Sequence, residues 1–432
     1  MKNYVSIIPS ISEKYGPIQP DQRIDLIDIL RGFALTGVLL VNMMNYGGHW
    51  DKWTGSLDTA FHVVEHFFFE ERFWRLFSIL FGLGFAIQLL RADAKGVNHV
   101  LVYLRRLAIL LGFGACSSIL WDVDILTSYA ILGVLLLPVR RWSPKAVLAL
   151  ALLVQLAPVI QGTSQRYLHQ YRMRDTEYAA KYEKTREQEA EEAQRRTDER
   201  REVLRNGSFI EVVAPRVRNY LRDFITIPWG FRSSSESWWG FFAMFLVGLY
   251  AGKRRIFQEY AKHRRFMKAV GWIGLLVGII GMSFLVWIRF FLQQPVQWSI
   301  LQRILMFTIT ILGFTGMTFF YAFVLSEWSL TKRFRFLQQG FAAVGRTALS
   351  NYLIQAMAMN VVFMGWGFGL FGQLGPAKTM LLSVPIYLML MLLSMWWIRR
   401  FRFGPFEWLW RSLTYWKLQP MRVRASTPDL TS

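Results

Sequence analysis

Long runs of apolar residues recur along this chain, and short polar or basic loops separate them. About 20 consecutive apolar residues form a helix long enough to cross the hydrocarbon core of a bilayer, so each run is a candidate span. We predict spans at about residues 26–46, 73–90, 101–120, 125–139, 146–160, 238–251, 267–292, 298–325, 347–368 and 378–397. The pattern therefore predicts an all-α polytopic membrane protein with about ten transmembrane helices and an external charged helical insertion.

The first predicted span is unusual because it carries Asp28, Arg31, Asn42, Asn45 and His49. At about 100° per residue these side chains fall near one face of a helix. An arginine or aspartate that faces lipid at mid-membrane costs roughly 2.5–3.5 kcal/mol, so this face should point into the protein interior or a wet cavity. We expect a polar path from Asp28 and Arg31 to His49. The alternative is an i,i+3 ion pair at the headgroup level, with asparagines that only bond neighbouring helices.

One segment, residues 165–205, breaks the apolar pattern. It contains 11 basic and 10 acidic residues and neither proline nor glycine, which predicts a solvated helix or helical hairpin. Residues 209–229 are amphipathic and suit the membrane interface or a partner helix. We therefore divide the chain into a cytoplasmic tail, five membrane helices, an external insertion, five more membrane helices and a basic cytoplasmic tail, at residues 1–22, 23–160, 161–237, 238–398 and 399–432.

Charge and composition set the orientation and exclude some classes of protein. The chain of 432 residues is 53% hydrophobic and has a formal net charge of +21. Its basic clusters lie after every second span, on the side of the N-terminus, which predicts a multi-pass protein of the cell membrane with both termini in the cytoplasm. The positive charge then favours contact with anionic lipids rather than with nucleic acid. The single cysteine, Cys116, excludes an internal disulfide.

A second group of ionisable residues lies around the start of the second predicted span. His62 and His66 are i,i+4 neighbours, and on a helix Glu65, Arg72 and Arg75 can share a face. This group could form an outward-facing pocket or an interfacial ladder of ion pairs. The two histidines could hold a metal in principle, but the sequence offers no evident third ligand, so we predict no metal site.

Two further features have both a functional and a structural interpretation. Asp124 could support a catalytic base or could simply cap the following helix. Thr347, Asn351 and Gln355 form a polar stripe at i,i+4,i+8 spacing, which could line a substrate path or bond neighbouring helices. The chain has no Walker, HExxH, GxSxG or paired-cysteine metal motif.

Six stretches of the sequence together carry a family resemblance: RIDLIDILRGFALTGVLLVN, FWRLFSILFGLGFAI, RRLAILLGFG, DILTSYAILG, ALSNYLIQ and GPFEWLWRSLTY. In this order, over nearly the whole chain, they resemble the bacterial YeiB-like family, known as domain of unknown function 418. That resemblance implies an integral cytoplasmic-membrane protein whose role is mostly unassigned. Members often have a histidine after the DIL motif, where this chain reads Thr127-Ser128-Tyr129.

The first span also resembles that of heparan-alpha-glucosaminide N-acetyltransferase, in the transmembrane acyltransferase group. The shared pattern is acidic-x-x-Arg-Gly at Asp28–Gly32, followed by residues 41–42 and 45–48. The resemblance implies that Asp28 and Arg31 lie near an entrance for cytoplasmic acyl-CoA. It also implies that His49 is the candidate base at the far side, with His62 and His66 as rivals.

We therefore expect an acyltransferase that moves an acyl group from acyl-CoA to an external hydroxyl or amine acceptor, such as a small molecule or glycan. Arg31 and other cytoplasmic cations would hold the donor phosphates. His49, helped by Asp124 or Glu65, would deprotonate the acceptor. Arg75 and the polar residues of the first and ninth spans, Asn42, Asn45, Asn351 and Gln355, would line the path.

Two other functions remain open at this stage. The same polar residues could line the path of a transporter for a small solute or lipid. A non-catalytic scaffold could use the charged helix as a docking arm. In each case we expect membrane lipids as partners and no nucleic acid. We expect no bound cofactor, with acyl-CoA only as a donor substrate. The oligomeric state stays open, and a homodimer is one option.

Overall fold

The computed structural model describes residues 25–47, 53–96, 100–120, 124–233, 235–292, 299–331 and 333–423, with the side chains of 223–237 excluded. Within these ranges the chain forms helices and no β-sheet, only an isolated bridge between Phe401 and Arg422. The predicted all-α class is confirmed.

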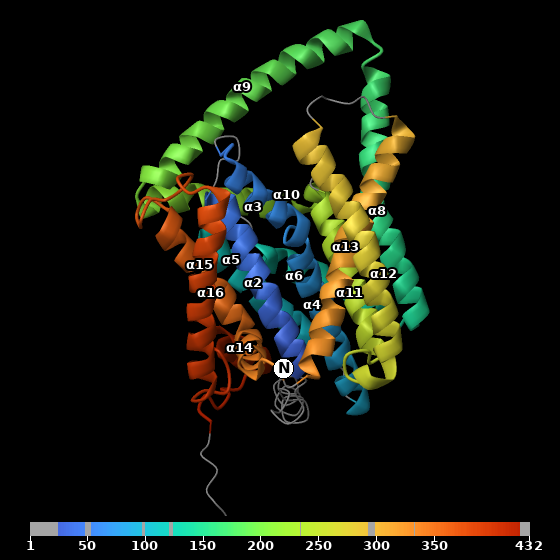
Figure 1. The fold of residues 1–432 in the computed structure, drawn as a ribbon, viewed down its shortest axis with the longest axis vertical. Helices are drawn as coiled ribbons and strands as arrows, with labels where there is room; N and C mark the ends of the chain where they lie inside the picture. The colour runs from blue at the N-terminus through green and yellow to red at the C-terminus, as the bar shows by residue number, and fades with distance from the viewer. Residues whose placement is uncertain are drawn as a thin grey trace, which may run out of the picture.

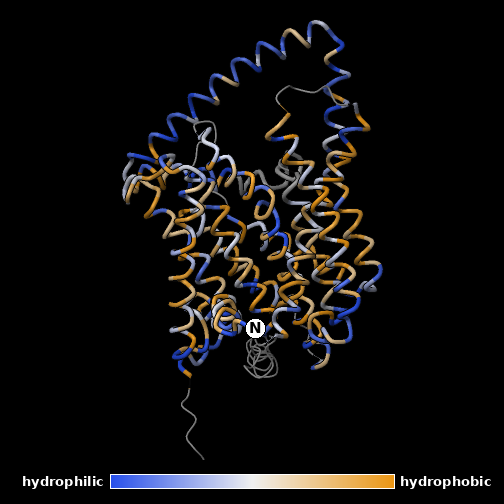
Figure 2. Tube along the Cα trace, viewed as in Figure 1, coloured by the Kyte–Doolittle hydropathy of each residue, from blue (hydrophilic) through white to orange (hydrophobic). Residues whose placement is uncertain are grey.

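The predicted spans correspond to helices. Among the described residues, seven helical segments are long and apolar enough to cross a membrane. They are α2 (Asp25–Gly47), α3 with α4 (Ser56–Phe68 and Arg72–Ala94), α5 (Val100–Leu120), α8 (Pro144–Arg172), α12 with η3 (Tyr260–Val286 and Trp287–Phe291), α13 (Ile300–Ser329) and α16 (Pro376–Ile398). The other predicted spans lie in the shorter apolar helices α6 (Ile125–Val134) and α15 (Ala348–Phe363) and in α11 (Ser235–Lys253). Hydrophobic residues predominate along the helices of the bundle (Figure 2).

Local sequence signals explain where several helices begin. The Ser143 hydroxyl accepts the amide of Ala146, and Pro144 occupies the first helical position of α8. Ser299 and Gln302 form a reciprocal capping box at the start of α13. Both arrangements satisfy amide groups that the helix itself leaves without partners.

Glycines allow several pairs of helices to approach very closely. α2 packs on α14 (Arg335–Arg346), and a Cβ atom on Gly32 would overlap the carbonyl oxygen of Phe341. Likewise, a Cβ atom on Gly345 of α14 would overlap the carbonyl oxygen of Asp28. α4 meets α11 in the same way through Gly82 and Gly248. Small residues at such contacts are typical of helix packing in membranes.

The charged segment forms one long helix, α9 (Thr176–Asn206), after α8 has continued to Arg172. α9 crosses the end of the bundle opposite to the end where α2 begins (Figure 1), and its residues are strongly hydrophilic (Figure 2). α10 (Phe209–Ser233) follows and contacts α5 and α11. The predicted solvated helix is therefore present, with a turn at residues 173–175 that separates it from the preceding span.

Candidate functional site

A partly open cavity of about 220 Å³ lies between α2, α4, α5, α6, the α14–α15 junction and α17 (Pro405–Tyr415). Asp28 and Arg31 line it from the first turns of α2. Their side chains are 3.4 Å apart, and Asp28 is buried. The pair therefore faces a hollow inside the protein rather than lipid, as the cost of exposing these charges to acyl chains predicts.

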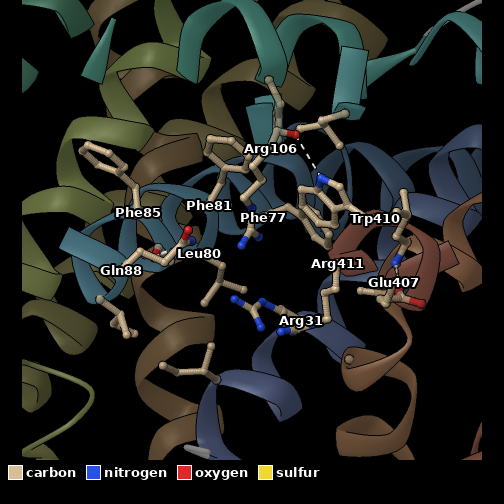
Figure 3. A pocket seen from close by; sticks show the side chains of 18 of the residues that line it. Arg31, Phe77, Leu80, Phe81, Phe85, Gln88, Arg106, Glu407, Trp410 and Arg411 are labelled. Atoms are coloured by element: carbon tan, nitrogen blue, oxygen red, sulfur yellow. Dashed lines mark hydrogen bonds between the residues drawn. The ribbon is translucent and has the colours of Figure 1, made fainter. Parts of the chain in front are cut away.

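Arginine is the dominant polar residue of this cavity. Among the residues that the structure describes, five arginines from five helices line it, whereas its acidic residues are Asp28 and Glu407. The arginines are Arg31 of α2, Arg91 of α4, Arg106 of α5, Arg346 of α14 and Arg411 of α17. Figure 3 shows Arg31, Arg106 and Arg411 around the same space. Positive charge from distant parts of the chain therefore gathers at one site.

The remaining wall of the cavity is mainly aromatic and aliphatic. It includes Phe77, Leu80, Phe81, Phe85, Tyr103, Leu110, Tyr129, Leu349, Tyr352 and Trp410. The Arg106 guanidinium lies 4.2 Å from the centre of the Trp410 ring, and the Trp410 indole donates to the Arg106 carbonyl at 2.9 Å (Figure 3). Guanidinium groups bind phosphate and carboxylate in a bidentate manner, so this lining suits an anionic group attached to an apolar or aromatic one.

Glu407 ties the wall of the cavity to the start of α15. Its buried carboxylate accepts the amides of Leu349 and Ser350 at 2.6 and 3.0 Å and the Ser350 hydroxyl at 2.5 Å. Burial raises the pKa of the Glu407 carboxyl above its ordinary value, which lessens its repulsion of an anionic ligand. We did not predict Glu407 from sequence. The available signal was a lone acidic residue in the aromatic stretch GPFEWLW.

The rest of the polar face of α2 does not line this cavity. Asn42 is half-buried and Asn45 is exposed, and neither belongs to the cavity wall. His49 lies outside the described residues. The structure therefore describes only the start of the predicted path, at Asp28 and Arg31. Its course from there to His49 stays a prediction.

The polar stripe of α15 bonds neighbouring helices. The Asn351 amide donates to the Ser394 hydroxyl of α16 at 2.9 Å and to the Thr347 hydroxyl at 2.8 Å. The Gln355 amide donates to the Leu35 carbonyl of α2 at 3.5 Å. A different face of α15 lines the cavity. Asn351 and Gln355 therefore bond neighbouring helices, which is the second of the two roles expected for this stripe.

A second polar site, the histidine cluster, consists of His62, Glu65, His66 and Glu70 at the junction of α3 and α4. The His62 and His66 Nε2 atoms are 2.9 Å apart. The His66 Nδ1 atom contacts Glu70 and lies 3.6 Å from the Glu65 carboxylate. Glu65 and His66 are 4% and 3% exposed, so this cluster is largely sheltered from the surroundings.

Next to this cluster, two arginines are far more buried than an interfacial ion-pair ladder would allow. Arg72 is 0% exposed and its guanidinium lies 4.9 Å from the centre of the Phe314 ring. Arg75 pairs with Glu71 at 3.3 Å and lies 4.6 Å from the Trp74 ring centre. Arg75 is thus packed against aromatic rings from α4 and α13, namely Trp74 and Phe314.

Asp124 caps a helix, which is the structural interpretation of the two that the sequence left open. Its carboxylate accepts the amides of Leu126 and Thr127 at 3.2 and 2.7 Å and so caps α6. This contact accounts for an acidic residue at that position without a catalytic role.

Comparison with known proteins places the chain among proteins of unknown function. Residues 251–417 match the family model "Protein of unknown function (DUF418)". The uncharacterized protein YxaH of Bacillus subtilis (strain 168) is 32% identical over 425 residues, covering 94% of this chain and 97% of YxaH. The uncharacterized protein YeiB of Escherichia coli (strain K12) is 26% identical, covering 90% of this chain and 95% of YeiB. No solved structure matches the chain significantly. The similarity to YxaH spans nearly all of both chains, and the chain belongs to the DUF418 family.

Proposed function

We propose that this protein is a membrane-embedded acyltransferase whose arginine-lined cavity binds the phosphate-bearing part of acyl-CoA. The observation that carries this proposal is the convergence of arginines from five helices on one cavity with apolar walls. A helix bundle gains little stability from gathering like charges, so such an arrangement is best explained by an anionic ligand.

The size of the cavity limits what it holds. Its volume of about 220 Å³ is below the roughly 300–1,000 Å³ that encloses a whole drug-sized ligand. We therefore expect it to hold one end of the donor, with phosphate groups on the arginines and the remaining part along the aromatic wall or outside. Asp28 fixes Arg31 by an ion pair and so limits the rotamers that its guanidinium can adopt.

The proposed reaction transfers the acyl group from the CoA thiol to a hydroxyl or amine acceptor. The thioester C–S bond of acyl-CoA breaks, and a C–O or C–N bond to an external hydroxyl or amine forms. His49 takes the acceptor proton, and the CoA thiolate leaves and is protonated. We expect the acyl group to reach the acceptor along α4, which lines the cavity over residues 77–91.

A transporter is the second candidate, and one observation favours it. The helical segment Ser56–Ala94 is interrupted between Phe68 and Arg72, where Glu71 has a φ of 70°. Interrupted helices beside buried charges often form the sites of transporters. Such a protein would move an anionic amphiphile without altering it covalently.

The first experiment measures donor binding. Protein in nanodiscs is titrated with radiolabelled acetyl-CoA and palmitoyl-CoA, alongside Arg31→Gln and Arg106→Gln. Loss of a charged hydrogen bond costs about 1.5–3 kcal/mol, so each variant should bind roughly 10- to 150-fold more weakly. Arg195→Gln, on the exposed face of α9, is the control and should bind like the parent protein.

Three results separate the alternatives. Transfer of label to an acceptor that is lost in His49→Ala, with binding retained, supports the acyltransferase. Uptake of an unmodified anionic lipid into proteoliposomes, with no covalent product, supports the transporter. Absence of acyl-CoA binding, or binding that both arginine variants leave unchanged, contradicts the proposal.

A further inference from the structure

We propose that His62, His66 and Glu65 bind a divalent transition-metal ion, with Zn²⁺ as the best-suited ion. The site lies in the histidine cluster, on α3 and outside the arginine-lined cavity. It is independent of the proposed acyl transfer, because it rests on side chains that do not line that cavity.

The two imidazole rings are arranged as metal ligands are. His62 and His66 are one helical turn apart on α3, and their Nε2 atoms point at each other across 2.9 Å. Two nitrogens bound to one tetrahedral Zn²⁺ at about 2.0–2.1 Å are roughly 3.4 Å apart, so a small opening of the pair would admit the ion.

A third ligand, which the sequence did not make evident, comes from the same helix. One ligand atom each from His62, Glu65 and His66 lies within 4.8 Å of the others. To join them, the Glu65 carboxylate must turn from the Nδ1 side of His66, where it lies 3.6 Å from that nitrogen, toward the two Nε2 atoms. The set of two histidines and one carboxylate is a usual one for catalytic Zn²⁺, and it leaves a fourth position for water or another oxygen ligand. In the sequence, the signal for the histidine pair is the H-x-x-E-H spacing, in which zinc peptidases use the two histidines as ligands, whereas the role of Glu65 as a third ligand rests on the geometry.

Glu70 lies on the Nδ1 side of the His66 ring, away from the Nε2 atom that faces His62. It contacts the Nδ1 atom of His66, so this nitrogen carries the proton and donates to the carboxylate. The His66 Nε2 atom is then left with its lone pair, which faces His62. A carboxylate behind a ligating histidine is the usual second layer of a zinc site, where it orients the ring and increases its basicity.

The surroundings hold this geometry and balance its charge. Phe290 of η3 packs against both imidazole rings, with centroids 5.0 and 5.5 Å away. The Tyr321 hydroxyl donates to the Phe68 carbonyl at 2.8 Å and fixes the end of α3. Two arginines also lie at the cluster: Arg289, 4.0 Å from Glu70, and Arg72, whose guanidinium donates to the Glu70 carbonyl. The carboxylates of Glu65 and Glu70 offset these charges before they offset that of a divalent ion.

The simpler alternative is that one Nε2–H donates to the other ring and no metal binds. Metal titration distinguishes the two. The purified full-length protein, stripped with chelator, is incubated with ZnCl₂ or CoCl₂, desalted and analysed for metal content. We expect one ion per chain, the visible absorption of four-coordinate Co²⁺, and a rise in the unfolding temperature with added Zn²⁺.

The variants make the result specific. His62→Ala, His66→Ala and Glu65→Gln should lose the ion and the metal-dependent rise in unfolding temperature, whereas Glu70→Gln should weaken binding roughly 10- to 100-fold. His169→Ala, at the far end of α8, is the matched control and should retain both. The unfolding temperature without metal shows whether each variant is folded. Less than one ion in the folded parent protein, or equal binding in folded His62→Ala, overturns the proposal.

Discussion

At the scale of single residues, Arg216 shows how a charge can organise the interior of a membrane protein. It is 4% exposed on α10. Its guanidinium donates to the carbonyls of Ile119 and Leu120 at 3.3 and 3.0 Å and to the Asn360 side chain at 2.9 Å. A cation here meets the carbonyls that α5 leaves without partners at its C-terminus. One side chain therefore joins α10 to α5 and α15.

We predict that Arg216→Ala lowers stability substantially. The substitution removes the Arg216 donor from the Ile119 carbonyl and the Asn360 side-chain oxygen, at about 1–3 kcal/mol for each group, so we expect a loss of roughly 2–4 kcal/mol. Tryptophan fluorescence during thermal unfolding in detergent measures it. Arg218→Ala is the matched control, because Arg218 is exposed two residues further along α10. Equal unfolding temperatures for the two variants would contradict the anchoring role.

At the scale of helices, backbone contact between α2 and α14 positions the cavity. Gly32 and Gly345 allow the two backbones to touch next to Asp28 and Arg31. The close approach fixes the first turns of α2 against the end of α14, from which Arg346 enters the cavity. Packing and ligand geometry are therefore coupled at this contact.

We predict opposite effects for two glycine substitutions. Gly32→Ala forces the helices apart and should destabilise the protein by about 1–3 kcal/mol, as other overpacked sites do. Gly112→Ala, on α5, meets no atom within 4 Å and should stabilise it by up to about 1 kcal/mol through helix propensity. Thermal unfolding of both variants in the same detergent provides the comparison. A neutral Gly32→Ala would show that this contact tolerates a side chain.

At the scale of the whole molecule, the two ends of the bundle differ in character. One end carries the arginine-lined cavity and the start of α2, and the hydrophilic helix α9 crosses the other (Figure 1). Basic loops favour the cytoplasmic side, so the cavity end should face the cytoplasm and α9 the outside.

Cysteine labelling tests this orientation. In a Cys116→Ser background, Lys184→Cys on α9 should react with a membrane-impermeant maleimide on intact cells. Arg333→Cys, in the basic loop after α13, should react only after permeabilisation. Both replaced residues are exposed. The reverse pattern would invert the proposed topology, and acyl-CoA could then not reach the cavity from the cytoplasm.

The helices were predictable because their signals are local. A run of apolar residues and a cap residue such as Ser143 act within a few turns, so the sequence determined the all-α class and the approximate position of the apolar helices. It also indicated the sheltered pair of Asp28 and Arg31, since a charge within an apolar run has a cost wherever the helix packs. The roles of Asp124, Asn351 and Gln355 stayed open, because the same polar groups can cap, bond helices or bind a ligand.

Only the tertiary structure decided which side chains meet. Arg31, Arg106 and Arg411 lie far apart in the sequence, and no local pattern places them around one cavity. Glu407 likewise gains its partners at α15 only when α17 docks there. Helix formation depends on neighbours in sequence, whereas a binding site depends on which helix faces turn toward one another, and that is settled by packing over the whole bundle.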